Sequence, residues 1–249
     1  DPALLTASIL GTDPLCFGDA NGTAAVTASG GSGVLTYLWS TGATTSTISG
    51  LVAGTYSVTV TDTNSCDTTL NITLVDPAQL VATIAGTDPL CFGDANGTAA
   101  VTASGGSGVL TYLWSTGATT STISGLVAGT YSVTVTDTNS CDTTLNITLV
   151  DPAQLIATIA GTDPLCFGDA NGSAAVTASG GSGVLTYLWS TGATTSSISG
   201  LVAGTYSVTV TDTNSCDTTL SITLVDPAQL IATIAGTDPL CFGDANGTA

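Results

Sequence analysis

Cysteine is the most reactive residue type in this sequence, and its spacing is regular. The chain of 249 residues contains seven cysteines and no histidine. They occupy two recurring positions, one after Pro-Leu and one after Asn-Ser: Cys16, Cys91, Cys166 and Cys241 in the first, and Cys66, Cys141 and Cys216 in the second. Without histidine or a Cys-x-x-Cys pair, zinc ligation is disfavoured, and the pattern predicts disulfides.

Aspartate is the second candidate for site chemistry, because it supplies all 18 acidic residues. The aspartates recur in segments with turn composition, close to asparagines. Calcium takes six to eight oxygen ligands from such loops, and the candidate ligands are Asp19, Asn21, Asp62 and Asp67. The alternative is that these residues form Asx turns on a solvated surface. No other metal and no cofactor is expected.

Catalysis is not expected from the remaining side chains. General acid–base catalysis near pH 7 uses histidine, or lysine and glutamate with shifted pKa values, and the chain has none of the three. Serine, aspartate and cysteine without a base form no nucleophilic triad. We therefore expect a protein that is not an enzyme.

The charge balance restricts the partners. A net charge of −18 without a single Lys or Arg repels nucleic acid and anionic lipid, so neither is an expected partner. No segment approaches the roughly 20 apolar residues of a membrane helix, so no membrane insertion is expected here. The sequence also lacks an initiator Met and a signal peptide pattern, which indicates a segment of a longer protein.

An internal repeat positions these residues. The string Gly-Thr-Asp-Pro-Leu-Cys-Phe-Gly-Asp-Ala-Asn-Gly begins at Gly11, Gly86, Gly161 and Gly236, a period of 75 residues. This length suits a small autonomous domain better than a solenoid coil. The sequence predicts repeats at 1–77, 78–152 and 153–227, with 228–249 as the start of a truncated fourth repeat.

Each repeat has the pattern of short β-strands. Period-2 alternation predicts strands over residues 23–29, 34–40 and 55–61, another around Leu70 to Leu74, and a first strand of the next repeat at 80–84. Gly-, Asn- and Asp-rich segments separate them. Six or seven strands in a repeat predict an all-β fold of tandem immunoglobulin-like β-sandwiches.

Aromatic residues sharpen this prediction. The spacing from Leu51 to Tyr56 is that of a tyrosine corner, in which a Tyr hydroxyl bonds to upstream backbone. Trp39 is expected to fill the centre of the core. The predicted core aromatics are Trp39, Tyr56, Trp114, Tyr131, Trp189 and Tyr206.

An ordered series of motifs resembles a known repeat. Gly22-Thr-Ala-Ala-Val-Thr-Ala-Ser-Gly-Gly, Leu35-Thr-Tyr-Leu-Trp-Ser-Thr-Gly-Ala-Thr-Thr, Ile48-Ser-Gly-Leu and Gly54-Thr-Tyr-Ser-Val-Thr-Val-Thr-Asp, followed by Cys66, resemble the SprB repeat of large surface adhesins of gliding bacteria. The resemblance implies export by type IX secretion, an extracellular or cell-surface location, and a role in gliding or attachment. In the same group of bacteria, Asp67-Thr68-Thr69 resembles an O-glycosylation acceptor, which makes Thr68, Thr143 and Thr218 candidate sites.

Two sets of disulfides satisfy the cysteine spacing. Pairing within a repeat gives Cys16–Cys66, Cys91–Cys141 and Cys166–Cys216, whereas pairing between neighbouring repeats gives Cys66–Cys91, Cys141–Cys166 and Cys216–Cys241. We expect the first set, because a small sandwich needs a staple and a loop of this length stabilises by about 4 kcal/mol. Strand number keeps the second set open, since with six strands the two cysteine loops share an end of the sandwich, whereas a seventh strand separates them.

The composition and the repeat favour a structural or adhesive array, a stalk or filament at the cell surface. Its expected partners are neighbouring repeats, copies of the chain in a filament, and external surfaces or polysaccharide. The alternative is a polysaccharide-binding, lectin-like module, with Phe17 as the exposed aromatic ring. Ice binding is less favoured, because flat threonine ladders usually need shorter repeats.

Overall fold

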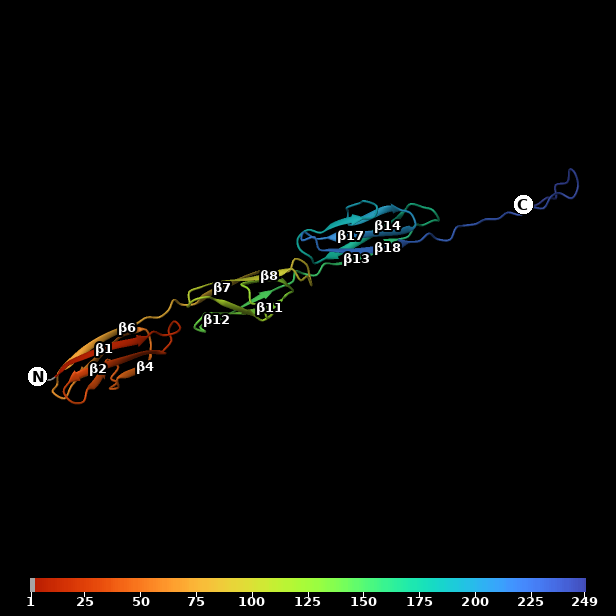
Figure 1. Ribbon diagram of the computed structural model, residues 1–249. Coiled ribbons are helices and arrows are strands. Elements are labelled where there is room, and N and C mark those ends of the chain that lie inside the picture. Colours follow the sequence, from red (N-terminus) through yellow and green to blue (C-terminus); the bar gives the residue numbers. More distant parts are fainter. Residues whose placement is uncertain (1–2) are drawn as a thin grey trace. The chain divides into compact units, whose positions relative to one another are not determined.

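The structure is a computed structural model that describes residues 3–249 (Figure 1). Its regular secondary structure is entirely β, with eighteen strands in antiparallel sheets, which confirms the predicted fold class. Each consecutive set of six strands is called a repeat below. The first repeat has β1 (Ala3–Thr12), β2 (Gly22–Gly31), β3 (Thr36–Trp39), β4 (Thr47–Leu51), β5 (Gly54–Thr61) and β6 (Asp67–Leu74).

The other two repeats follow the same order. The second has β7 (Val81–Thr87), β8 (Gly97–Ser104), β9 (Thr111–Trp114), β10 (Thr122–Leu126), β11 (Gly129–Thr136) and β12 (Asp142–Leu149). The third has β13 (Ile156–Thr162), β14 (Gly172–Ser179), β15 (Thr186–Trp189), β16 (Ser197–Leu201), β17 (Gly204–Thr211) and β18 (Asp217–Leu224).

Two three-stranded sheets make up each repeat, in the orders β1-β2-β4 and β3-β5-β6 in the first. The core lies between them, because one sheet contributes Ala24, Val26, Ile48 and Leu51 and the other contributes Trp39, Val58, Val60 and Leu74. Alternate residues of each strand point into this layer, as the period of 2 requires. Equivalent residues form a second and a third core.

The aromatic residues hold the sandwich at its centre and at one corner. Trp39 is 2% exposed, and its Nε1 donates to Thr45 O at 2.8 Å. Tyr56 is half-buried, and its hydroxyl donates to Val52 O at 2.9 Å, the bond that defines a tyrosine corner. Tyr131 makes the equivalent bond to Val127 O, also at 2.9 Å.

Strand directions place the loops at two ends of each sandwich. Thr63 N donates to Ser32 O at 3.0 Å, so the ends of β2 and β5 lie side by side and the two strands run the same way. Since β4 is antiparallel to β2 and β3 is antiparallel to β5, β3 and β4 also share a direction. The β3–β4 connection therefore changes sheets without reversing the chain. As a result the β1–β2 loop and the β5–β6 loop lie at opposite ends.

The chain divides into two compact units, Asp1–Pro89 with Ala95–Val150 and Leu90–Asp94 with Asp151–Ala249. The β7–β8 loop thus groups with the third repeat. The predicted boundaries after residues 77 and 152 fall in the segments between β6 and β7 and between β12 and β13.

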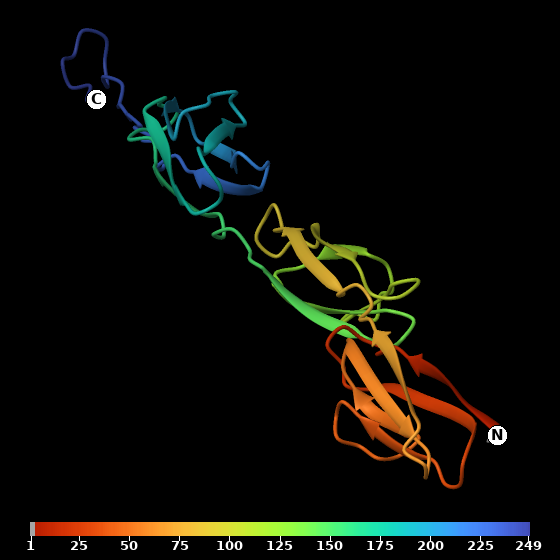
Figure 2. The same cartoon turned by 90° about the vertical axis from the view of Figure 1, so that its left-hand side faces the viewer.

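After β18, the described residues contribute only an isolated bridge between Thr237 and Thr248, and they extend away from the sheets (Figure 2). Across residues 3–249 there is no helix of the length and apolarity needed to cross a bilayer.

Candidate functional site

The cysteines join one repeat to the next. In the first unit, Cys16 in the β1–β2 loop forms a disulfide with Cys141 in the β11–β12 loop, with 5.7 Å between the Cα atoms. In the second unit, Cys91 is bonded to Cys216 with a Cα–Cα distance of 5.6 Å. Both distances are ordinary for disulfides. Each bond connects residues that are 125 positions apart in the sequence.

All six predicted pairings are wrong. Cys16–Cys66, Cys91–Cys141 and Cys166–Cys216 do not form, and neither do Cys66–Cys91, Cys141–Cys166 and Cys216–Cys241. Pairing within a repeat fails because β3 and β4 run in the same direction, which puts the two cysteine loops at opposite ends of a six-stranded sandwich. The end of one repeat that carries Cys16 instead meets the end of the next repeat that carries Cys141.

The loop that supplies the first cysteine has a fixed shape. We call residues 15–19, 90–94 and 165–169 the inserting loops. In the first of them, Leu15 N donates to Asn21 Oδ1 at 2.9 Å, and Asn21 Nδ2 donates to Asp19 Oδ2 at 3.0 Å. Gly18 has φ of 79° and donates its N–H to Asp76 Oδ2 at 3.1 Å. The carboxylate of the segment that leaves the repeat therefore holds the tip of the loop.

The loop that supplies the second cysteine is built on a buried aspartate. We call residues 62–66, 137–141 and 212–216 the receiving loops. Asp137 is 6% exposed and accepts backbone N–H bonds from Ser107 at 2.7 Å, Asn139 at 2.8 Å and Cys141 at 2.9 Å. Ser140 has φ of 67°, an uncommon left-handed conformation that completes the turn. The aspartate thus fixes the backbone of the bonded cysteine.

These aspartates are ionised at neutral pH. The N–H of Cys66 lowers the pKa of Asp62 below 3.8; burial opposes this effect, and the N–H groups of Ser32 and Asn64 reinforce it. At Asp137, burial favours the neutral acid, but the three donated N–H bonds outweigh it and lower the pKa. Hydrogen bonds to a carboxylate stabilise the charged form.

A side-chain amide adds a second contact to each joint. Asn139 Nδ2 donates to Leu15 O at 2.9 Å in the first unit. Asn214 Nδ2 donates to Leu90 O at 2.9 Å in the second. The inserting loop is therefore recognised by a hydrogen bond to its backbone, next to the disulfide. The recurring Asp-Thr-Asn-Ser-Cys string contained this asparagine, but as turn composition it gave no sign of a contact with another repeat.

The predicted calcium ligands separate within a repeat. Asp19 and Asn21 lie in the inserting loop, whereas Asp62 and Asp67 lie at the opposite end, so the predicted four-residue site is not assembled. Across the described residues, no group of three or more His, Cys, Asp or Glu side chains has an arrangement that could hold a metal ion.

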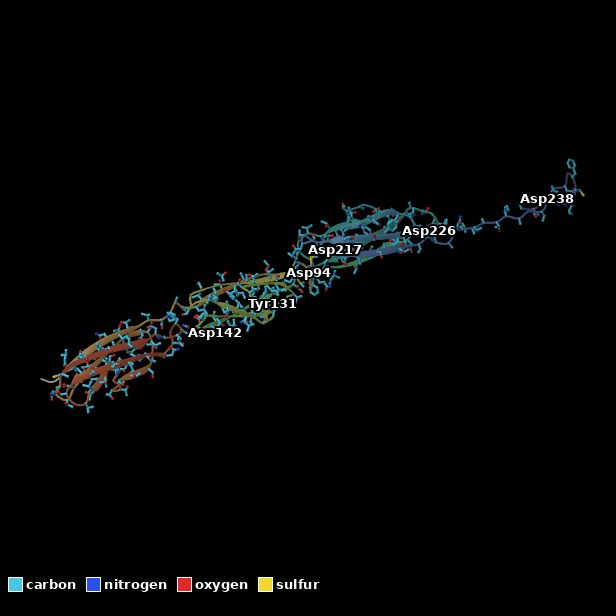
Figure 3. The ribbon with its side chains drawn as sticks, in the orientation of Figure 1. Asp94, Tyr131, Asp142, Asp217, Asp226 and Asp238 are labelled. Atoms are coloured by element: carbon cyan, nitrogen blue, oxygen red, sulfur yellow. A yellow bond between two sulfur atoms is a disulfide. The ribbon has the colours of Figure 1, made fainter. Side chains whose placement is uncertain are left out.

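Carboxylates from two repeats instead approach each other across the joint. In the first unit, a hollow is lined by Phe17, Asp19, Asp142 and Thr143. In the second unit, Asp94 and Asp217 line the equivalent hollow (Figure 3). The predicted glycosylation sites Thr143 and Thr218 are half-buried and lie at these hollows, and Thr68 is half-buried on β6. Their glycosylation stays a prediction.

The fold and these joints define a class of protein: a tandem array of immunoglobulin-like sandwiches that are cross-linked from repeat to repeat. The SprB repeat family model matches residues 11–44, 83–119 and 158–194. The chain therefore belongs to the SprB-repeat family, and the predicted resemblance is confirmed.

Comparison with other known proteins adds the fold alone. No curated protein matches the chain. Among solved structures, Sidekick-1 immunoglobulin domains 1–5 are 13% identical over 91% of this chain, with a TM-score of 0.35. The eight N-terminal Ig domains of Down Syndrome Cell Adhesion Molecule are 12% identical over 87% of this chain, also with a TM-score of 0.35. The chain spans 59% and 33% of these two structures.

Proposed function

We propose that this chain is a load-bearing segment of an extracellular repeat array, a stalk or filament at the cell surface with no enzymatic activity. The observation that carries the proposal is the disulfide between Cys16 and Cys141, which joins two repeats that each have their own core. Independent domains need no such bond to fold. A bond at the joint serves to hold neighbouring repeats together.

The two disulfides interlock along the chain, and this supports a mechanical role. From Cys16 to Cys216 the polypeptide has 200 residues. Through both disulfides, the shortest covalent path crosses from Cys16 to Cys141, returns 50 residues to Cys91, and crosses to Cys216. A pulling force therefore cannot extend the chain beyond this path, even if every repeat unfolds.

The surroundings of a cell suit this design. Disulfides persist in oxidising, extracellular compartments, which supports an extracellular location. The absence of Lys and Arg leaves trypsin-like proteases without cleavage sites. The SprB-repeat family suggests attachment or gliding motility as the process served, with an external surface as the partner.

Single-molecule extension tests the proposal. At about 3.4 Å per extended residue, the oxidised path between Cys16 and Cys216 reaches about 170 Å, and the reduced chain reaches about 700 Å. We expect reduction to add about 500 Å to the maximum extension of the full chain. Equal extension in both states would show that the disulfides carry no load.

Two variants sharpen this measurement. Cys16→Ser removes one disulfide, and the shortest path from residue 16 to Cys216 becomes the 75 residues to Cys91, or about 250 Å. Cys66→Ser is the matched control, because Cys66 forms no disulfide, and it should keep the oxidised extension of the unmodified chain.

The exposed ring of Phe17 favours a second candidate function, polysaccharide binding. Phe17 is 55% exposed and borders the hollow that Asp19, Asp142 and Thr143 line. An aromatic face beside hydroxyl and carboxylate groups is suited to stacking on a sugar ring. Calorimetric titration with bacterial polysaccharides tests this function: binding that Phe17→Ala, Phe92→Ala and Phe167→Ala together abolish would support it, and no heat of binding would reject it.

A further inference from the structure

The two kinds of joint loop each occur once more with a free thiol. Cys66, in the first receiving loop, and Cys166, in the third inserting loop, are both exposed and form no disulfide. Their equivalents are Cys141 and Cys216 in the receiving loops and Cys16 and Cys91 in the inserting loops, and all four are bonded. The chain thus offers one complementary half of a joint in the first repeat and the other half in the third.

The free receiving loop already has the shape of the bonded ones. Asp62 is 7% exposed and accepts N–H bonds from Ser32 at 2.9 Å, Asn64 at 2.8 Å and Cys66 at 2.9 Å. Ser65 has φ of 67°, the same as Ser140. No rearrangement of this loop is needed before a partner binds.

The free inserting loop is also preformed. Leu165 N donates to Asn171 Oδ1 at 2.9 Å, and Gly168 N donates to Asp226 Oδ2 at 3.0 Å. Leu165 is 77% exposed, whereas Leu15, which contacts a receiving loop, is 49% exposed. The difference indicates the surface that a receiving loop covers when it binds.

We propose that Cys66 of one copy of this chain and Cys166 of a second copy form a disulfide, which joins the copies end to end through a third joint of the same construction. In that joint the amide of Asn64 donates to the backbone carbonyl of Leu165, as Asn139 does to Leu15. The inference rests on the proposed array for its purpose. It adds the partner, a second copy, and the two residues that bind it.

The reaction is thiol–disulfide exchange with a small-molecule disulfide as the oxidant. The thiolate of Cys66 attacks that disulfide, forms a mixed disulfide and releases one small thiol. The thiolate of Cys166 on the second copy then attacks the Cys66 sulfur and releases the other small thiol. Two protein thiols are oxidised and one small disulfide is reduced to two thiols, with the two protons of the protein thiols retained on the products.

Two features of the chain bear on how fast the copies join. Residues after β18 hold only the Thr237–Thr248 bridge, so moving them away from the end of the third repeat breaks no sheet. A net charge of −18 makes the copies repel each other at low ionic strength. Since salt screens exposed charges beyond about 10 Å at 0.1 M, joining should be faster at 0.5 M salt than at 0.02 M.

Paired cysteine variants of the full chain test the proposal. All carry Cys241→Ser, which leaves Cys66 and Cys166 as the unpaired thiols. With glutathione disulfide as oxidant, this parent should form a ladder of multimers on non-reducing electrophoresis. Further substitution by Cys66→Ser or by Cys166→Ser should leave monomers. An equal mixture of the two variants should form dimers and nothing larger, with a Cys66–Cys166 peptide in the mass spectrum.

Other outcomes overturn the inference. Homodimers of each single variant at the yield of the mixture would mean indiscriminate thiol oxidation, and no dimers in the mixture would mean that the ends do not fit. A ladder that needs Cys241 instead of Cys166 would contradict the register. None of these results would change the extension of a single chain, so this test fails independently of the proposed load-bearing role.

One variant separates recognition from simple thiol reactivity. Asn64→Ala should slow dimer formation about tenfold, the factor expected for one hydrogen bond. Its Cys66 should still react at the parent rate with a small thiol reagent. Equal slowing of both reactions would assign Asn64 to the shape of the loop instead of to contact with the second copy.

Discussion

Asp137 links the charge chemistry of the chain to its disulfide chemistry. It follows β11, is buried, and holds Ser107, Asn139 and Cys141 through their backbone N–H groups. One side chain thereby fixes the connection between β8 and β9 relative to the cysteine that reaches the preceding repeat. Because the carboxylate accepts three bonds in its ionised form, the receiving loop depends on its charge.

Acid should therefore destabilise every repeat through these aspartates. The pKa values of Asp62, Asp137 and Asp212 are lowered in the folded protein from 3.8. A lowered folded pKa gives stabilisation that is complete above 3.8 and is lost as pH falls through the folded value. We expect the melting temperature to be constant from pH 7 to pH 5 and to fall below pH 4.

Substitution identifies the groups responsible. The triple variant Asp62→Asn, Asp137→Asn and Asp212→Asn should melt lower than the parent at pH 7, because the amide cannot accept all three bonds as a charged group does. Its melting temperature should also depend less on pH below 4. Asp142→Asn, at an exposed position of the next strand, is the control. An unchanged acid transition in the triple variant would refute the assignment.

At the scale of the strand, β10 shows how a bulge produces a pattern that alternation does not detect. Ile123 and Leu126 are both buried although three positions separate them. The register between β10 and β8 shifts between Ser124 and Leu126, which leaves Gly125 as the extra residue with φ of 72°. The bulge turns Leu126 back to the core just before the tyrosine corner.

Gly125→Ala should destabilise the second repeat by about 1–2 kcal/mol, the strain of a left-handed conformation for a residue with a Cβ. Steric overlap adds nothing, since the nearest atom to the added Cβ, Ala95 O, is 3.9 Å away. Gly125→Asn is the control, because asparagine tolerates this conformation better, and it should retain more stability. Calorimetric melting that ranks Ala equal to Asn would exclude backbone strain as the cause.

Much of the fold could be predicted from the sequence, because alternation specifies which face of a strand is buried. The strands around Tyr37 and Val58 follow that rule, and the period of 75 residues sets their recurrence. The strand Thr47–Leu51 escaped, since its bulge breaks the alternation. The disulfides escaped for a related reason. Their pairing depends on the common direction of β3 and β4, which neither strand number nor cysteine spacing reveals.

At the scale of the whole molecule, the disulfides convert separate cores into one covalent network. Each of the three cores is complete within its own six strands. The disulfides nevertheless span 125 residues each and overlap in sequence, because Cys91 lies between Cys16 and Cys141. Unfolding of any one repeat therefore leaves a chain that is still closed into loops, and this restricts the conformations of the unfolded state.

Removing one loop closure should lower stability in proportion to that restriction. In the chain-entropy model, a closed loop of this length stabilises by about 5 kcal/mol, so Cys16→Ser should lower the free energy of unfolding by up to about that amount. Cys66→Ser changes the same residue type in the same repeat but breaks no bond, and it should melt like the parent. Scanning calorimetry of both variants and of the reduced parent makes the comparison: equal melting of Cys16→Ser and Cys66→Ser would mean that the joint contributes nothing to stability, whereas a loss confined to Cys16→Ser would locate the stabilisation in the bond between repeats.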